Sequence, residues 1–332
     1  MKSDNILVVG AAGQIGTELV PALRRIHGDL HVVAADLRPL AREKKSAGPY
    51  VQLDVLNYGA LATLITRYDI NQVYLLAATL SAIGEKDPHR AWDLNMQSLL
   101  NILDLAREKR LAKVFWPSSI AVFGPDAPRT ACPQDAVKSP STVYGISKAA
   151  GEQWCQYYWN KYRVDIRSLR YPGLISHSAP PGGGTTDFAV DIFHQAVRHQ
   201  KYTSFLPADT CLPMMYMSDA VRATMELMEA PANRLLVKTS YNLSAISFTP
   251  AQVARSIARY IPAFTIDYAP DNRQSIADSW PSSLDDSAAR NDWHWDHEYE
   301  LAGITRDMLL HLVTGTELSL SGITDLLSPI SL

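Results

Sequence analysis

The most constraining feature of the sequence is an apolar run, Asn5–Val9, that leads directly into the stretch GAAGQIG at residues 10–16. A segment with apolar residues at helical spacing follows it. Gly10 permits a tight turn, Gly13 lets backbone amides approach a bound group, and Gly16 lets the helix pack close to the strand. The alternative interpretation of the glycines is a tightly packed turn that holds no ligand. The order strand, glycines, helix predicts the first unit of a doubly wound sheet.

The first half of the chain repeats this alternation of strand and helix. Short β-branched apolar runs predict strands, and longer segments with apolar residues at helical spacing predict helices between them. The predicted strands are Asn5–Val9, His31–Ala35, Gln72–Leu76, Lys113–Trp116 and Asp165–Leu169. The predicted helices are Ile15–Arg25, Tyr58–Tyr68, Arg90–Lys109 and Tyr144–Tyr162. We therefore expect an α/β protein with a Rossmann-type, doubly wound parallel sheet covered on both faces.

The pattern changes after about residue 171, where loops become long and rich in Pro, Gly, Ser and Asp. The clearest is PPGGGTTD, residues 180–187, and helices are predicted at Phe188–His199, Ser218–Glu229 and Thr249–Tyr260. Long irregular loops in a compact protein are often functional. We expect a sheet domain over residues 1–172. Residues 173–332 should be mainly a smaller substrate-binding region that caps the sheet edge, with some segments returning to it.

Composition and charge exclude several classes of protein. The 332 residues carry a net charge of −3, so no basic face for nucleic acid is expected. No apolar run is long enough to span a membrane, and the five residues before Ile6 leave no room for a signal peptide. Three scattered cysteines fit a reducing compartment, so we expect a cytoplasmic protein. Because no zinc-type ligand spacing occurs, no metal site is expected.

An acidic residue completes the nucleotide-binding pattern. Asp36 ends the second strand, 20 residues past Gly16, where a carboxylate can accept hydrogen bonds from a ribose diol and repel a 2′-phosphate. This favours NAD, and Arg38 keeps NADP open as the alternative. Asp54 follows a third extended run and could contact the adenine or, equally, cap the next helix. The small residues of 76–79 leave room for a flat cofactor, or simply pack closely.

Three polar residues form a candidate catalytic group. Tyr144 and Lys148 are four residues apart in a predicted helix and so share one face. An ammonium beside a phenol favours the phenolate, which can take a proton from an alcohol. Ser119 lies just after a strand, at the edge where ligands of open α/β sheets bind. A Tyr-x-x-x-Lys pair alone is common on surface helices, and only its context favours catalysis.

Together these residues resemble the extended short-chain dehydrogenase/reductase superfamily, in the branch of the nucleotide-sugar epimerases. The segments FWPSSIAVFG, YGISKAAGE, RYPGLIS and PPGGGTTDFAVDIF are similar to the L-threonine 3-dehydrogenases of that superfamily. The resemblance implies NAD-dependent oxidation of the L-threonine 3-hydroxyl to L-2-amino-3-oxobutanoate. It assigns Tyr144 as the base, Lys148 as the group that lowers its pKa, and Ser119 as the residue that orients the hydroxyl.

The resemblance also implies the binding residues. For the cofactor they are Gly10, Gly13, Gln14, Ile15, Gly16, Asp36, Leu37, Arg38, Asp54, Val55, Leu76, Ala77, Ala78, Thr79, Asn95, Tyr144, Lys148, Tyr171 and Pro172. For the substrate they are Ser81, Ser119, Tyr144, Thr185 or Thr186, and Trp280. In the 180–187 loop, backbone amides and one threonine hydroxyl are expected to approach a small amino acid, and a plain hinge is the alternative.

Two further expectations concern the alternative substrate and the assembly. A nucleotide-sugar epimerase or dehydratase of the same superfamily remains the second candidate, but its diphosphate substrate would draw arginines. Few basic residues lie near PPGGGTTD, which favours a smaller substrate.

The helices Arg90–Lys109 and Tyr144–Tyr162 match the superfamily's dimer interface and carry apolar and aromatic residues. These are Trp92, Leu99, Leu103, Trp154, Tyr158 and Tyr162. We expect a homodimer through these helices.

Overall fold

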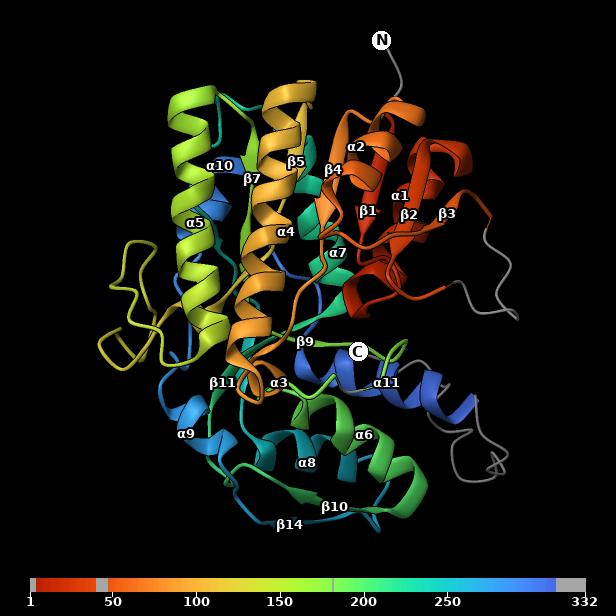
Figure 1. The fold of residues 1–332 in the computed structure, drawn as a ribbon. Coiled ribbons are helices and arrows are strands. Elements are labelled where there is room, and N and C mark those ends of the chain that lie inside the picture. The colour runs from red at the N-terminus through yellow and green to blue at the C-terminus, as the bar shows by residue number, and fades with distance from the viewer. Residues whose placement is uncertain (1–3, 40–46, 181, 315–332) are drawn as a thin grey trace.

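The computed structural model describes residues 4–39, 47–180 and 182–314, and its centre is a six-stranded parallel sheet (Figure 1). The strand order is β3-β2-β1-β4-β5-β7. The strands are β1 Ile6–Val9, β2 Val32–Asp36, β3 Tyr50–Gln52, β4 Gln72–Leu75, β5 Lys113–Phe115 and β7 Ile166–Arg167. The order reverses between β1 and β4, which is where open α/β sheets bind ligands. The predicted Rossmann-type fold is confirmed.

Helices cover both faces of this sheet because its strands are buried on both sides. One face packs against α1 and α7, and the other against α2, α4 and α5. These helices are α1 Gln14–His27, α2 Tyr58–Arg67, α4 Pro88–Lys109, α5 Val143–Tyr162 and α7 Met217–Glu229. Because α7 comes late in the chain yet covers the sheet, it is one of the segments that return from the second region. The division at residue 172 stays a prediction.

The second region builds its own core below the carboxyl end of the sheet (Figure 1). Its longer helices are α6 Phe188–His199, α8 Pro250–Ala258 and α11 Leu301–Thr314. Two small sheets join them, formed by β9 Gly173–Ile175, β11 Leu212–Tyr216 and β13 Ile246–Phe248, and by β10 Lys201–Ser204 and β14 Thr265–Tyr268. Large buried side chains such as Phe188, Phe193 and Phe248 fill the space between them.

Short elements complete the edge of the main sheet. A three-stranded parallel sheet, in the order β12-β8-β6, continues beside it. Its strands are β6 Ser118–Ser119, β8 Leu169–Tyr171 and β12 Tyr241–Asn242, and the short helices elsewhere in the chain are α3 Ser81–Gly84, α9 Arg273–Asp278 and α10 Ser287–Trp293. The predicted strand 165–169 is therefore divided into β7 and β8, which pair with different neighbours. Within the described part of the chain, no helix has the length and apolar character needed to cross a bilayer.

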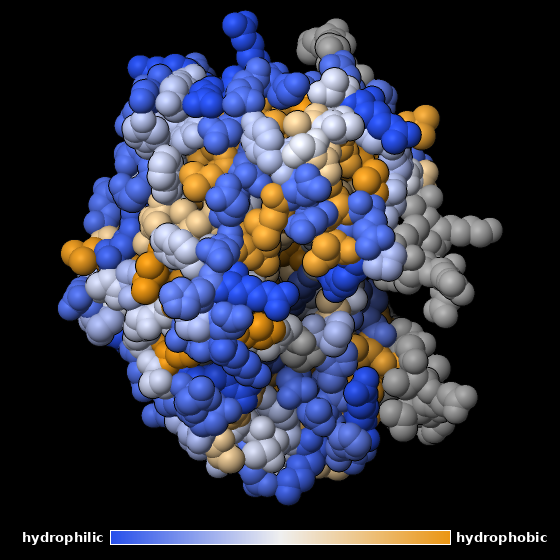
Figure 2. Space-filling model, in the orientation of Figure 1, coloured by the Kyte–Doolittle hydropathy of each residue, from blue (hydrophilic) through white to orange (hydrophobic). Residues whose placement is uncertain are grey.

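The helices predicted to form the dimer face are only partly exposed. Trp92 and Trp154 are exposed, but Leu99, Leu103 and Tyr158 are buried in the core between α4, α5 and the sheet. These three residues cannot contribute to an outward dimer face, because a long helix on a sheet buries one side of its own apolar pattern. Figure 2 shows hydrophobic residues among hydrophilic ones over the face that α4 and α5 present.

Candidate active site

A cavity of about 240 Å³ lies at the carboxyl end of the central strands, between the sheet and the second region. Most of the residues predicted for the site lie around it. They are Gly10, Gly13, Gln14, Ile15, Gly16, Leu76, Ala78, Ser81, Ser119, Tyr144, Lys148, Tyr171, Pro172, Thr185, Thr186 and Trp280. These residues come from both regions of the chain, so the fold brings segments that are far apart in the sequence to one cavity.

The glycine loop at one end of the cavity has no room for larger residues. Gly10 has φ +88°, and a Cβ there would lie 2.7 Å from the Ala77 nitrogen. A Cβ on Gly16 would lie 2.5 Å from the Gly10 oxygen. The first turn of α1 contains no acidic side chain, and the N-cap Gly13 makes no side-chain hydrogen bond. The free helix N-terminus and the bare loop fit the pyrophosphate of a dinucleotide.

Asp36 is held at the end of β2 beside this loop. Its Oδ2 accepts a hydrogen bond from the Ala12 amide at 2.9 Å, and its Oδ1 accepts one from Arg38 Nε at 3.1 Å. Burial opposes ionisation of Asp36, but the hydrogen bonds from Arg38 and Ala12 outweigh it and lower the pKa of the carboxyl. A fixed carboxylate at this point fits a ribose diol, and Arg38 partly neutralises it.

Several residues predicted to bind the cofactor do not line the cavity. They are Asp36, Leu37, Arg38, Asp54, Val55, Ala77, Thr79 and Asn95. The Asp54 side chain accepts a hydrogen bond from the Leu56 amide, whereas Asn57 caps α2, so the capping alternative for Asp54 is wrong. Asn95 exchanges two hydrogen bonds with the backbone of Thr79 and donates a third to Ser147. Its amide therefore ties the segment after β4 to α5.

Ser119, Tyr144 and Lys148 all face the cavity. Lys148 Nζ donates to the Pro117 carbonyl at 2.6 Å and lies 4.4 Å from the centre of the Trp116 ring. Burial lowers the pKa of Lys148 to about 7. Burial also raises the pKa of Tyr144 to about 12, against the effect of a hydrogen bond with Ser119. The expected lowering of the Tyr144 pKa by Lys148 is not present here, because burial dominates both groups.

A buried charge network supports this group from behind. Glu152, one turn after Lys148 on α5, is fully buried and accepts two hydrogen bonds from Arg170, at 2.8 and 2.9 Å. It also accepts one from the Ser118 hydroxyl at 2.7 Å and pairs with Lys138 at 2.9 Å. Burial of Glu152 is outweighed by the Arg170 and Lys138 charges, which lower its pKa. The network fixes the strand end that carries Ser119.

The predicted substrate loop has a different local structure from the expected one. The Gly183 and Gly184 amides donate to the Asp187 carboxylate at 2.6 and 2.8 Å. The expectation that these amides approach a substrate is therefore wrong for Gly183 and Gly184, because Asp187 closes the loop on itself. Thr185 is 1% exposed, and its hydroxyl finds no hydrogen-bond partner among the described residues. A buried hydroxyl without a partner at a cavity wall is available to a ligand.

Some residues that line the cavity were not predicted from the sequence. The missed residues are Leu80, Pro117, Ser118, Ile120, Leu174 and Asp187. Each lies within a few positions of a predicted residue, so the motifs found the right segments but not every side chain. The Glu152–Arg170 pair carries no separate motif. The only available signal was a carboxylate one helical turn past Lys148.

With the geometry in place, comparison with known proteins identifies the class. The sequence pattern described as the NAD dependent epimerase/dehydratase family matches residues 6–244, and the chain belongs to that family. A relative from Staphylococcus haemolyticus, described as an uncharacterized epimerase/dehydratase, is 47% identical over 308 residues. The match covers 92% of this chain and 96% of the relative.

Solved structures narrow the similarity within the family. The holo form of a GalE-like L-threonine dehydrogenase from Cupriavidus necator is 56% identical, with a TM-score of 0.91 over 93% of this chain and 99% of that one. A structure described as a monomeric L-threonine 3-dehydrogenase from a metagenome database is 43% identical, with a TM-score of 0.91. That match covers 94% of this chain and 100% of the other. The predicted resemblance to the threonine dehydrogenases of this superfamily is confirmed.

Proposed function

We propose that the protein is an NAD-dependent L-threonine 3-dehydrogenase that oxidises the side-chain hydroxyl to L-2-amino-3-oxobutanoate. The observation that carries the proposal is the grouping of Ser119, Tyr144 and Lys148 at the wall of a cavity of about 240 Å³. Among the described lining residues, Asp187 supplies the one carboxylate and none is arginine. A small amino acid suits this lining better than a diphosphate, which usually draws arginines.

The glycine loop and Asp36 would hold the dinucleotide. The bare loop at Gly10, Gly13 and Gly16 and the N-terminus of α1 suit the pyrophosphate. The Asp36 carboxylate suits the adenosine ribose diol and disfavours a 2′-phosphate, so NAD is proposed over NADP. When bound, the nicotinamide supplies the acceptor for the hydride that leaves the substrate carbon.

Tyr144 is proposed to act as the base that removes the proton from the substrate hydroxyl. Ser119 shares a hydrogen bond with Tyr144 and would hold the same hydroxyl. Lys148 lies 5.6 Å from the centre of the Tyr144 ring, so its ammonium form, which predominates below its pKa of about 7, favours the phenolate, and at higher pH this help is lost. As the proton passes to Tyr144 Oη, the C–H bond breaks and a carbonyl forms at the same carbon.

Thr185 is proposed as the threonine that contacts the substrate, with Ser81 and Trp280 as further walls. Its buried hydroxyl is without a described partner, which costs free energy until a ligand fills the role. The Asp187 carboxylate at the same wall can attract the substrate ammonium. We expect Thr185→Val to raise the Michaelis constant for L-threonine without changing NAD affinity, whereas Thr186→Val should have the smaller effect. A larger effect at Thr186 would reverse this assignment.

A spectrophotometric assay tests the activity itself. Purified protein with NAD should form NADH in the presence of L-threonine and not with UDP-glucose or UDP-galactose. A nucleotide-sugar epimerase, the second candidate within the family, would convert the UDP-sugars without net formation of NADH. Chromatography of the UDP-sugar mixture therefore separates the two functions in one set of samples.

We also propose a homodimer through α4 and α5 and a cytoplasmic location. Large side chains on these helices are exposed, namely Trp92, Ile146, Trp154 and Tyr157. One similar structure is described as monomeric, so the assembly requires its own test. Light scattering at micromolar concentration should give the mass of two chains, and the mass of one chain would refute the dimer. The three free cysteines suit a reducing compartment.

A further inference from the structure

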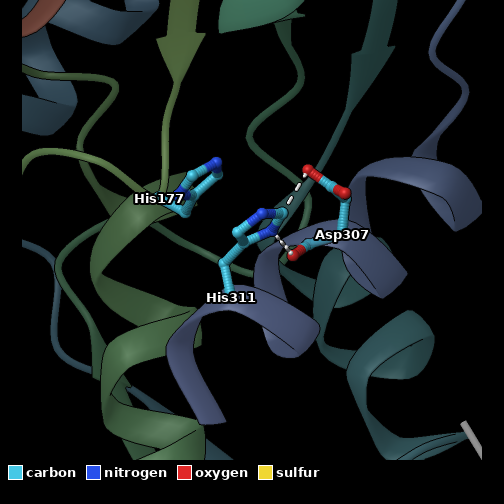
Figure 3. Close-up of side chains that lie close together, drawn as sticks. All are labelled: His177, Asp307 and His311. Carbon is cyan, nitrogen blue, oxygen red and sulfur yellow. Dashed lines mark hydrogen bonds and ion pairs between the residues drawn. The ribbon is translucent and has the colours of Figure 1, made fainter. Parts of the chain in front are cut away.

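Three potential metal ligands lie together away from the cavity. His177 follows β9 at the beginning of the loop that leads to Thr185, and Asp307 and His311 lie one turn apart on α11. Figure 3 shows the His177 ring beside the His311 ring, with Asp307 on the other side of His311. Their ligand atoms all lie within 4.8 Å of one another. None of the three lines the cavity of the proposed active site.

The orientation of His311 is typical of a metal-binding histidine. Its Nδ1 lies 2.9 Å from the Asp307 carbonyl oxygen and 3.6 Å from Asp307 Oδ2. Because a carbonyl only accepts, this contact requires the proton on Nδ1 and leaves the lone pair on Nε2. Metal-bound histidines usually donate their other ring nitrogen to a carbonyl or carboxylate in this way.

The remaining two ligands are also held by neighbours. The His177 and His311 rings stack with centroids 3.8 Å apart and an interplanar angle of 9°. The Asp307 carboxylate accepts a hydrogen bond from the Tyr216 hydroxyl, and Ser176, next to His177, donates to Glu18 at 2.5 Å. The two imidazole rings therefore already lie side by side, with a ligand nitrogen of each within 4.8 Å of the other. Since lone pairs lie in the ring planes, one ring must turn out of the parallel stack to bind the same ion.

We propose that His177, Asp307 and His311 form a binding site for a divalent transition metal of the zinc class. Two imidazole nitrogens and one carboxylate oxygen are a donor set that suits Zn²⁺, Co²⁺ or Ni²⁺ and not the oxygen-seeking Mg²⁺ or Ca²⁺. Water would complete the coordination. The metal would link the residues that follow β9 to α11, two parts of the structure that are far apart in the sequence.

This site has no signature in the sequence. His177 lies far along the chain from Asp307 and His311, and the i, i+4 pair on α11 is only half of a ligand set. The expectation of no metal site rested on sequence spacing, which detects only ligands that are neighbours along the chain. The proposal rests on the folded geometry and is independent of the proposed dehydrogenase activity.

Calorimetric titration of Zn²⁺ into untagged, chelator-treated protein near neutral pH tests the proposal. We expect saturable binding of one ion per chain. His177→Ala and His311→Ala should each weaken binding by more than the roughly 10- to 100-fold that loss of an outer-shell partner costs. His89→Ala is the matched control, because His89 is exposed on α4 and outside the cluster, and it should bind as the wild type does.

Two measurements keep the test decisive. Co²⁺ should give the visible absorption of a low-symmetry nitrogen- and oxygen-bound ion in the wild type and in His89→Ala, but not in the His177 or His311 variants. Circular dichroism confirms that the variants fold. Zn²⁺ affinity that is unchanged in both histidine variants would overturn the proposal, because cysteines or other histidines would then hold the ion. Absence of saturable Zn²⁺ and Co²⁺ binding by the wild type would overturn it as well.

Discussion

Replacing Gly173 by alanine should damage the substrate side of the cavity and leave the cofactor side intact. A Cβ on Gly173 would lie 2.7 Å from the Thr186 Cβ and 2.5 Å from the Met214 sulfur. Favourable carbon–carbon contacts begin near 3.5 Å, so Thr186 would have to move by about 0.8 Å. Overpacking of this kind costs about 1–3 kcal/mol of stability. A displacement near 1 Å at a substrate-positioning residue can lower catalytic efficiency by about 100-fold.

The assay compares two alanine variants of the same segment. Gly182→Ala is the matched control, because its Cβ would lie at 3.4 Å from Leu80 Cδ1, an ordinary contact. Urea unfolding, NAD affinity by fluorescence, and kcat/KM for L-threonine are measured for both. We expect Gly173→Ala to lose stability and kcat/KM while NAD affinity is kept, and Gly182→Ala to match the wild type. Equal kcat/KM in both variants would refute the proposal that the segment carrying Thr185 and Thr186 positions the substrate.

Three further predictions test the charges around the site. Replacing Asp36 by asparagine should weaken NAD binding and raise the NADP-to-NAD preference, measured as a ratio of dissociation constants; an unchanged ratio would contradict its contact with the ribose. Since the pKa of Lys148 is lowered from 10.5 to about 7, the unfolded chain binds a proton that the folded chain lacks between these values, so folding stability should rise with pH across that window. Lys148→Met should abolish this part of the pH dependence of the unfolding free energy, measured by urea titration at several pH values. The same pH dependence in the wild type and the variant would exclude Lys148 as its source. Glu152→Ala leaves the buried Arg170 without a carboxylate partner and should cost about 3–5 kcal/mol, whereas a loss of well under 1 kcal/mol would show that the pair is hydrated.

The sequence was sufficient for the fold and for the segments that form the cavity. The glycine spacing and the alternation of strands and helices specify parallel pairing around β1, because only that arrangement buries continuous apolar strands on both faces. Ser119 lies at a strand end, and Tyr144 and Lys148 lie near the beginning of α5, which faces the same edge of the sheet, so the three residues line one cavity. These predictions depend on local pattern, which a single sequence carries.

What the sequence could not supply depends on contacts between distant segments. The short strands β10, β11 and β14 were missed because each is defined by its partner more than by its own few residues. The pKa of Tyr144 was expected to fall because of the Lys148 charge, but burial by the surrounding chain raises it and lowers the pKa of Lys148 as well. The Asp187 contact with the loop glycines depends on side-chain orientation, which spacing alone does not determine.

The proton-transfer role of Tyr144 is the central claim, and the Tyr144→Phe variant tests it most directly. NADH formation from L-threonine and NAD binding are measured on the same preparation, across alkaline pH for the wild type. Because burial raises the pKa of Tyr144 to about 12, the wild-type rate should climb with pH as the phenolate forms. Tyr144→Phe should lower turnover by about 10²- to 10⁴-fold while NAD still binds. Turnover that survives the substitution, or NADH formation that never depends on L-threonine, would contradict the account.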